Sequence, residues 1–314
     1  MSASDSLLCP RVHYLLSGTF NTLFLYLLAF SPYGPAGPTL TVHRKHRAEG
    51  PHQFLALSQD RKTAYATTWA QPPTLSSWEV LAGGRDGVAK VNTVPICALP
   101  RLAPPFSTPR PAELTYLCLA PVPLPVPAAT GSYLTVSPPS LGFSSARIYQ
   151  AGGPVAQTFA ADSATGGFGE QLQEVIYLDG GEEELRDPKT DKTRVALRYG
   201  SHAVDIDPVL QRAYVPHVCV ESHSRMLLAL LGQRRLPVMR FSRSGRDSIF
   251  VYSFNQDGTL HHLNEVPSHG NKGHEGPRHS IPSADGKKLY VCLLYTSDAA
   301  DDLLCVDLGG RRII

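Results

Sequence analysis

Short runs of alternating hydrophobic and polar residues, separated by turn-forming residues, dominate this chain and predict strands rather than helices. Three segments align without gaps on a terminal tyrosine: residues 53–65 (QFLALSQDRKTAY), 202–214 (HAVDIDPVLQRAY) and 278–290 (RHSIPSADGKKLY). Each contains a short apolar stretch, a polar turn and a second apolar stretch that ends in Ala-Tyr or Leu-Tyr. Each segment is therefore predicted to form a strand, a tight turn and a second strand.

The repeat extends upstream of these tyrosines and has the length of a propeller blade. Tyr26, within LFLYLLAF, precedes Tyr65 by 39 residues, and Tyr252, within SIFVYSF, precedes Tyr290 by 38 residues. A four-stranded unit that repeats at about 40 residues is typical of a β-propeller. Solenoids of helix pairs have a similar period, but these units carry turn residues in place of a 3.6-residue hydrophobic stripe. We predict an all-β chain folded as a propeller.

Composition narrows the class of protein further. The 314 residues include 27 prolines and 26 glycines, which favours many turns and excludes a helical bundle. The 29 basic and 27 acidic side chains leave a net charge of +2, and no basic stretch is interleaved with aromatic residues. We therefore expect no nucleic-acid partner. The hydrophobic fraction of 42% is enough for a buried core.

One apolar run, residues 23–30, bears on location. It is too short to span a bilayer, so we expect no membrane partner. A targeting segment is the alternative, but the run lacks a basic leader and a small-residue cleavage site close behind it. We favour a buried strand and a cytoplasmic location by default.

Three segments break the blade pattern. Residues 97–128 contain nine prolines and one acidic residue, and residues 219–243 also lack the repeat. We favour translated introns for both, and long surface loops are the alternative. Residues 292–314 resemble a non-native, adapter-derived tail. The domain is thus predicted to be a partial propeller over residues 12–291. Five of the six cysteines fall in these segments, and none has metal-ligand spacing, so we expect neither a disulfide framework nor a metal site.

The aligned segments also place polar side chains at one equivalent position. Gln53, His202 and Arg278 each lie twelve residues before the repeat tyrosine. In a propeller this position falls at the start of a strand, beside the central channel. Different polar groups on equivalent blade positions would then converge on one axis, as in a binding site.

At this point the sequence shows a family resemblance. GSHAVDIDPVLQRAYV, SIFVYSFNQDGTLHHLNEVPSHGNKGHEGPRHSIPSADGKKLYV and YLLSGTF resemble the fungal 3-carboxy-cis,cis-muconate cyclase family. That family belongs to the seven-bladed lactonase-type propellers, together with bacterial 6-phosphogluconolactonases. The resemblance covers roughly residues 12–96 and 129–291 without the 219–243 insertion. It implies a fungal isomerase of aromatic catabolism, in the β-ketoadipate pathway, and a seven-bladed propeller whose C-terminal blades are missing here.

The resemblance further implies a reaction and its residues. One carboxylate of 3-carboxy-cis,cis-muconate adds across a double bond to give a lactone, with no metal or organic cofactor. The family's catalytic histidine corresponds to His202, within GSH, and a substrate-binding arginine to Arg278, within GPRH. A further glutamate and a second arginine would lie after Tyr290. The chain as printed is therefore expected to be inactive or insoluble, because open blade edges also favour aggregation.

The chemistry of these residues agrees with such a role. The planar guanidinium of Arg278 suits a carboxylate of a small-molecule polycarboxylate substrate, and a histidine of near-neutral pKa, such as His202, suits a general acid. An inter-blade ion pair and a histidine bonded to the blade backbone are the respective structural alternatives. His52, Gln53 and His279 are candidates for lining the channel.

Two other functions stay open. One is a lactone hydrolase of the 6-phosphogluconolactonase type, and the other is a catalytically silent binding propeller. Formation and opening of a lactone need similar positive charge around a carboxylate, so the sequence separates these enzymes poorly. Phosphate-loop, zinc-protease and serine-hydrolase motifs do not occur at a usable spacing. Self-association into a homo-oligomer is also left open.

Overall fold

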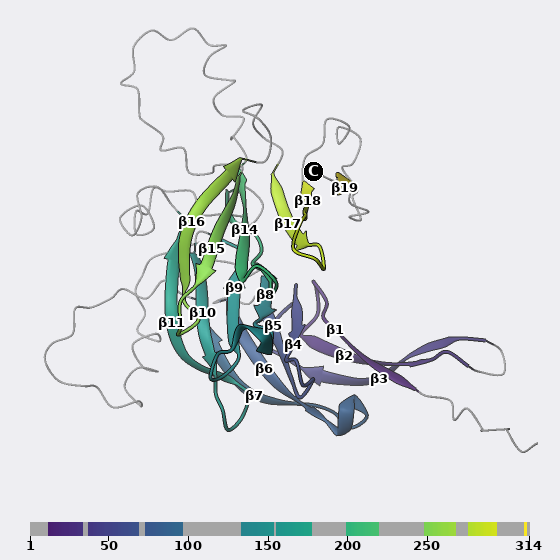
Figure 1. Cartoon of the computed structure of the whole chain (residues 1–314). Coiled ribbons are helices and arrows are strands. Elements are labelled where there is room, and N and C mark those ends of the chain that lie inside the picture. Colours follow the sequence, from purple (N-terminus) through teal and green to yellow (C-terminus); the bar gives the residue numbers. More distant parts are fainter. Residues whose placement is uncertain are drawn as a thin grey trace, which may run out of the picture.

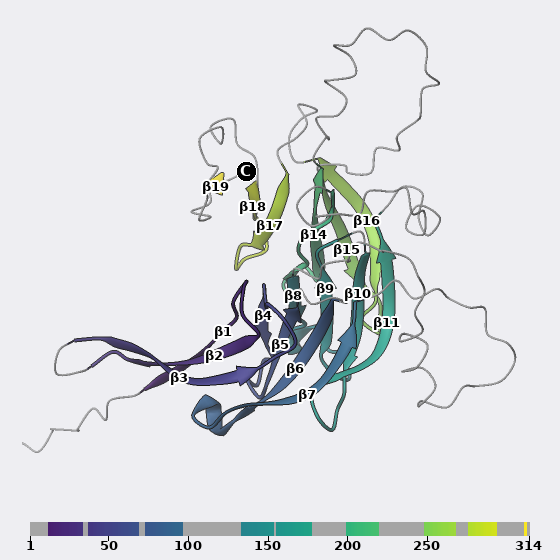
Figure 2. The ribbon, with the colours of Figure 1, turned by 180° about the vertical axis from the view of Figure 1, so that it is seen from behind.

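The computed structural model describes residues 12–33, 37–68, 73–96, 133–153, 155–177, 199–219, 248–267, 276–293 and 311–312. Within these ranges the chain forms five antiparallel sheets, with only two single-turn 3-10 helices, η1 (Ala82–Gly84) and η2 (Pro139–Leu141). The sheets follow one another in chain order along an arc, from the purple β1–β3 to the yellow β17–β18 (Figures 1 and 2). The same ranges contain no helix long and apolar enough to cross a membrane.

Each sheet is built from consecutive strands, as expected for a propeller blade. The first two blades consist of β1 (His13–Ser17), β2 (Phe24–Ser31) and β3 (Thr39–Arg47), and of β4 (Leu55–Leu57), β5 (Thr63–Thr68), β6 (Thr74–Leu81) and β7 (Gly87–Pro95). The third blade consists of β8 (Tyr133–Val136), β9 (Arg147–Ala151), β10 (Val155–Ala161) and β11 (Phe168–Ile176). The apolar run near the N-terminus is therefore a strand, β2.

The last two blades carry the residues singled out by the sequence. The fourth consists of β12 (Tyr199–Ser201), β13 (Asp205–Asp207), β14 (Arg212–Cys219), β15 (Ser248–Phe254) and β16 (Leu260–Pro267). The fifth consists of β17 (Pro277–Pro282), β18 (Leu289–Leu293) and β19 (Arg311–Arg312). The all-β propeller predicted from the repeat is confirmed by this order of sheets.

In all three aligned segments the repeat tyrosine pairs with the residue at the equivalent position of the preceding strand. The residue nine positions earlier lies opposite it on the preceding strand: Ala56 opposite Tyr65, Asp205 opposite Tyr214, and Ile281 opposite Tyr290. The predicted strand, turn and strand are thus confirmed, together with a common register. Because side chains alternate between faces along a strand, this register puts equivalent residues of every blade on the same face.

The tight turns of the second and fifth blades are also equivalent. In the second, the Ser58 hydroxyl donates to the Asp60 carboxylate at 2.6 Å, and in the fifth Ser283 donates to Asp285 at 2.6 Å. Both turns need one residue in the left-handed region, which glycine adopts most easily. Gly286 fills that position with φ of 68°, whereas Arg61 adopts it with φ of 58°.

The third blade contains a further copy of the repeat that the gapless alignment missed. Tyr149 pairs with Thr135, so the two residues are fourteen positions apart instead of nine. The additional residues form a longer connection that includes η2. A gapless comparison cannot align a copy with a longer turn, although Ala-Arg-Ile-Tyr resembles the endings of the other copies.

Two of the repeat tyrosines form hydrogen bonds to the following blade. The Tyr65 hydroxyl donates to the Gly166 carbonyl oxygen at 2.6 Å, and the Tyr149 hydroxyl donates to the Gly258 carbonyl oxygen at 2.8 Å. Each glycine lies in the turn between the last two strands of the following blade. In the second and third blades the repeat tyrosine therefore links its own blade to the next one through a hydrogen bond.

The hydrophobic core is divided among the interfaces between successive sheets. Leu25 of β2 packs with Trp78 of β6, Tyr65 of β5 packs with Ile148 of β9, and two similar clusters join the remaining sheets. Trp78 is buried in the cluster that joins the first two blades. Such stacking of sheets face to face gives a propeller its stability without a single central core.

Most of the three irregular segments lies outside the described residues. This holds for residues 97–128, 220–243 and 294–310, so the intron, loop and tail interpretations remain predictions. Within the last segment, β18 continues to Leu293, two residues past the predicted end of its strand. Arg312 and Arg311 of β19 pair with Val291 and Cys292.

Candidate functional site

Strands near the start of neighbouring blades, called inner strands below, lie side by side and form the framework of the site. β4 contacts β8, and β13 contacts β17. The Tyr133 hydroxyl of β8 donates to the Asp205 carboxylate of β13 at 2.6 Å, which links the two pairs. The predicted site residues lie at the beginning of these strands, so side chains distant in the sequence meet at one end of the strand row.

A glycine begins each of the two motifs that carry the family resemblance. Gly200 has φ of 103° and Gly276 has φ of 62°, conformations that other residues rarely adopt. Each glycine lies two residues before a candidate side chain, His202 and Arg278 respectively. The backbone conformation that each glycine permits precedes the entry of the chain into its inner strand.

His202 and Arg278 are in direct contact across the interface of the last two blades. The Arg278 Nε–H group donates to His202 Nε2 at 3.1 Å. Because Nε2 accepts this hydrogen bond, the neutral ring carries its proton on Nδ1. The ring of His279 lies edge-on to His202, with centroids 4.8 Å apart. His202 is 1% exposed, while Arg278 and His279 are half-buried.

Burial and the neighbouring basic groups favour the neutral form of His202. Burial lowers the pKa of His202 well below its ordinary value, and the neighbouring His279 and Arg278 lower it further. This differs from the near-neutral pKa that we expected for a general acid. The main physical reason is that the ring is removed from water, which disfavours its charged form; in addition, its polar neighbours His279 and Arg278 are bases rather than carboxylates.

The two remaining candidates lie on the second blade. His52 is 2% exposed, and its backbone N–H group donates to the Thr19 carbonyl oxygen of the first blade at 2.8 Å. Burial lowers the pKa of His52 to about 4. Gln53 is half-buried, and its side-chain oxygen has no hydrogen-bond partner among the described residues. The structure therefore brings His202, Arg278 and His279 together, and places His52 against the neighbouring blade.

A row of rings joins the second blade to this cluster. Phe54 and Tyr133 have ring centroids 4.2 Å apart, and Tyr133 and His279 have centroids 5.4 Å apart. Phe54 and His279 each lie eleven residues before their repeat tyrosine, so they are equivalent positions. The corner predicted from the alignment is therefore lined with aromatic as well as polar groups.

Asp205 is the main functional group that sequence reasoning missed. We assigned no site role to it, yet it is 8% exposed and accepts three hydrogen bonds. Tyr133 donates to Oδ1, while the backbone N–H and hydroxyl groups of Ser280 donate to Oδ2 at 2.8 and 2.9 Å. Burial raises the pKa of Asp205, although the three hydrogen bonds act in the opposite direction.

A signal for these partners was present in the sequence. Tyr133 belongs to the copy of the repeat with the longer turn, and aligning Tyr149 with the other tyrosines would have placed it beside Phe54 and His279. Asp205 and Ile281 are equivalent positions, nine residues before a repeat tyrosine. A carboxylate at a position that is apolar in another blade indicates a polar partner, but only the fold identifies that partner.

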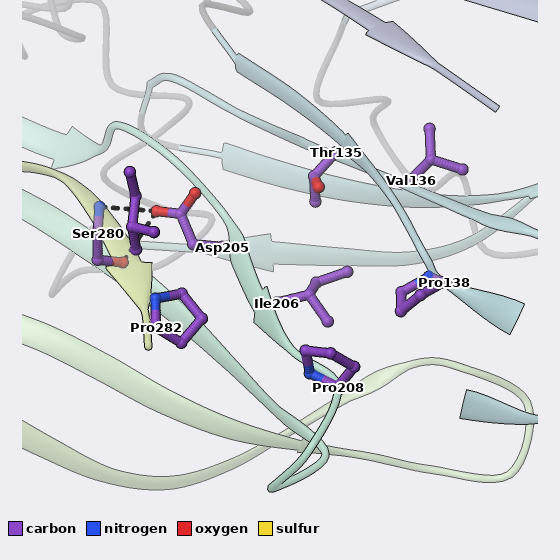
Figure 3. Close-up of a pocket in the computed structure, with 9 residues that line it drawn as sticks. Thr135, Val136, Pro138, Asp205, Ile206, Pro208, Ser280 and Pro282 are labelled. Atoms are coloured by element: carbon purple, nitrogen blue, oxygen red, sulfur yellow. Dashed lines mark hydrogen bonds between the residues drawn. The ribbon is translucent and has the colours of Figure 1, made fainter. Parts of the chain in front are cut away.

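An open pocket of about 350 Å³ lies on the same inner strands, farther along them. Asp205 and Ser280 form part of its wall, and their hydrogen bond is visible in Figure 3. The remaining lining is largely apolar: Thr135, Val136, Pro138, Ile206, Pro208, Ile281 and Pro282. The pocket therefore offers hydrophobic contact next to a buried carboxylate. Among the described residues, no group of three or more histidine, cysteine, aspartate or glutamate side chains is arranged to hold a metal ion.

The chain is similar in sequence to a curated protein, muconate cycloisomerase 1 from Cutaneotrichosporon cutaneum. The two are 24% identical over 284 residues, which cover 90% of this chain and 57% of that protein. The chain thus spans little more than half the length of this relative. No family model matches the chain.

Two solved structures resemble the fold. A protein from Lactobacillus plantarum has a TM-score of 0.55 at 16% identity, covering 90% of this chain and 60% of that one. Sqt1 from Chaetomium thermophilum has a TM-score of 0.50 at 11% identity, covering 91% of this chain and 52% of that one. At these identities the likeness concerns the fold alone. Together with the relative above, they show a β-propeller chain that resembles the carboxymuconate cyclase family.

Proposed function

We propose that the protein containing this chain is a cofactor-free cycloisomerase that converts 3-carboxy-cis,cis-muconate to its lactone. The observation that carries the proposal is the contact between Arg278 and the buried His202, on inner strands of adjacent blades. Similarity to a protein named muconate cycloisomerase over 90% of the chain supports the same reaction. The proposal includes a small polycarboxylate as the partner, action in aromatic catabolism, and the cytoplasm of a fungus as the location.

Arg278 would bind one substrate carboxylate. Its guanidinium is half-buried and can form two parallel hydrogen bonds to a carboxylate. Burial is the main cause of the low pKa of His202, and a carboxylate at this position would offset the part of that effect that comes from the Arg278 charge. Substrate binding would therefore raise the pKa of His202 and favour uptake of the proton that the reaction needs.

His202 would then act as the general acid. A second substrate carboxylate forms a C–O bond to one alkene carbon, while the π electron pair moves to the other carbon. Transfer of a proton from the His202 imidazolium to that carbon forms the C–H bond and completes the lactone. Solvent returns one proton to the imidazole, so the reaction consumes one proton and no atom leaves the substrate.

The low pKa of His202 favours a second candidate, a catalytically silent binding propeller. In that case Arg278 would still bind a carboxylate, but His202 would stay neutral and only pack beneath it. A lactone hydrolase on the same scaffold would use the same positive charge and an activated water. The three candidates predict different results with a polycarboxylate that can cyclise and with a sugar lactone.

The test uses the protein encoded by the full spliced transcript that contains this chain. Lactonisation of 3-carboxy-cis,cis-muconate is followed by loss of ultraviolet absorbance. His202→Gln should lower kcat by about a hundredfold or more, as expected for loss of a general acid. His217→Gln is the matched control, because His217 is a 1% exposed histidine of the same blade.

Arg278→Met should mainly raise KM, by about tenfold or more, because a charge-assisted carboxylate contact is lost. Arg212→Met, on β14 of the neighbouring blade, is its control. A soluble protein that binds the substrate without converting it would favour the binding propeller. Hydrolysis of a sugar lactone without lactonisation would favour the hydrolase.

A further inference from the structure

The Asp205 carboxylate joins three blades immediately beside the candidate site. Its Oδ2 atom accepts hydrogen bonds from the backbone N–H and hydroxyl groups of Ser280, at 2.8 and 2.9 Å. Ser280 lies two residues after Arg278 on β17. A shift of Ser280 along β13 would therefore displace the guanidinium that meets His202.

Tyr133 connects the same carboxylate to the opposite side of the site. Its hydroxyl donates to Asp205 Oδ1 at 2.6 Å, and its ring contacts the His279 ring with centroids 5.4 Å apart. His279 in turn contacts His202, so the hydroxyl of Tyr133 limits the position of both imidazoles. A swing of the whole Tyr133 side chain away from His279 would carry its hydroxyl away from Asp205.

Apolar contacts also hold the fifth blade, but they do not set the position of Ser280 relative to Asp205. The hydrophobic cluster between the fourth and fifth blades consists of Ile249 and Tyr214 against Leu289, Val291 and Leu293 of β18, while β17 lies against β13 and β14. Apolar packing is tolerant of small shifts, whereas hydrogen bonds to a buried carboxylate require specific donor positions. Satisfying Asp205 thus fixes β17 against β13 at the level of Arg278.

We propose that Tyr133 and Asp205 are positioning residues, which hold His279 and Arg278 against His202 through one buried hydrogen-bond network. This inference rests on the proposed function for its catalytic consequence, but the positions of the imidazoles can be measured without turnover. The pKa of Asp205 is raised by burial, and its three donors offset part of that effect. Loss of a donor would therefore disturb the charge of the network as well as its geometry.

The experiment compares Tyr133→Phe with Tyr65→Phe. Both variants remove one hydroxyl that bonds across a blade interface and keep the ring, but the Tyr65 hydroxyl bonds to Gly166, in a different blade interface. Proteins labelled with ¹⁵N-histidine are titrated by NMR, and affinity for tricarballylate is measured as a polycarboxylate probe. Ser280→Ala serves as a second variant, because it removes one donor to Asp205 and leaves the backbone donor in place.

We expect both substitutions of tyrosine to lower stability by a similar amount. Only Tyr133→Phe and Ser280→Ala should move the imidazole signals of His202 and His279, and weaken tricarballylate binding by about tenfold, the equivalent of one hydrogen bond. Unchanged imidazole signals in both variants, or equal changes in Tyr65→Phe, would overturn the proposal. If the wild-type protein neither binds the probe nor lactonises carboxymuconate, the proposed function fails, and the imidazole signals still decide whether Tyr133 and Asp205 position the histidines.

Discussion

His52 makes the stability of this protein depend on pH in a way that can be calculated. The side chain is 2% exposed, and both ring nitrogens lack a hydrogen-bond partner among the described residues. Burial lowers its pKa to about 4 from an ordinary value of 6.5, while the nearby Glu49 acts weakly in the opposite direction. The folded state therefore favours the neutral ring, and the unfolded state accepts a proton first as the pH falls.

The sign and size of the effect follow from proton linkage. Stability is fully present above pH 6.5 and is lost as the pH falls toward the folded pKa of about 4. Between about pH 7 and pH 5 the two pKa values predict a loss of about 2 kcal/mol from this residue alone. That loss is a large part of the stability of an ordinary domain.

The measurement is urea unfolding, followed by tryptophan fluorescence at several pH values between about 5 and 7. His52→Leu removes the titrating group and keeps an apolar side chain of similar volume. The difference in unfolding free energy between the variant and the wild type should change by about 2 kcal/mol over this range. His261→Leu, at an exposed position of β16, controls for the loss of a histidine as such.

One result would refute the reasoning. If His52→Leu and the wild type lose stability in parallel as the pH falls, then burial does not lower the pKa of His52 in the folded state. Since other buried groups, including His202, contribute to the dependence of both proteins equally, only the difference between the two proteins bears on His52.

Four further substitutions test the contacts between blades and the conformation of one turn. Tyr65→Phe and Tyr149→Phe should each lower the free energy of unfolding by about 1–3 kcal/mol, because a buried carbonyl oxygen loses its donor; equal stability of variants and wild type in urea would contradict this. Gly258→Ala should be destabilising by about 1–3 kcal/mol, because φ is +85° and a Cβ atom would lie 2.6 Å from the Arg147 side chain. A melting temperature of Gly258→Ala below that of the wild-type protein would confirm this loss of stability. Arg61→Gly should stabilise by about 0.5 kcal/mol, because φ is 58° at an exposed turn, and an unchanged midpoint in urea would argue against backbone strain there.

The strand units could be predicted because their determinants are local. A turn sequence such as Ser58-Gln-Asp60 forms its hydrogen bonds within a few residues, so the same spacing gave the same turn at Ser283 and Asp285. The third-blade copy could not be found by the same comparison, because its turn is longer and alignment without gaps requires equal turns. With that copy missed, Tyr133 was missed as well.

The neighbours of each site residue could be predicted only in part. Equivalent positions in the repeat placed His202 and Arg278 at one corner, and the structure has them in contact. The rotation and stacking of the blades decide which of the polar residues meet. Apolar packing at the sheet interfaces sets that rotation and stacking. Asp205 illustrates the limit, since its three donors come from two other blades.

The sequence by itself determined the all-β class, the blade period, the strand–turn–strand units and the position of the candidate corner. These follow from hydrophobic alternation and turn chemistry, which act over short distances along the chain. Only the tertiary structure decided that His202 is neutral, that Tyr133 and Ser280 bind Asp205, and that His52 lies buried against the first blade. The physical reason is that burial and partner charge depend on residues from neighbouring blades, which become neighbours only when the sheets stack.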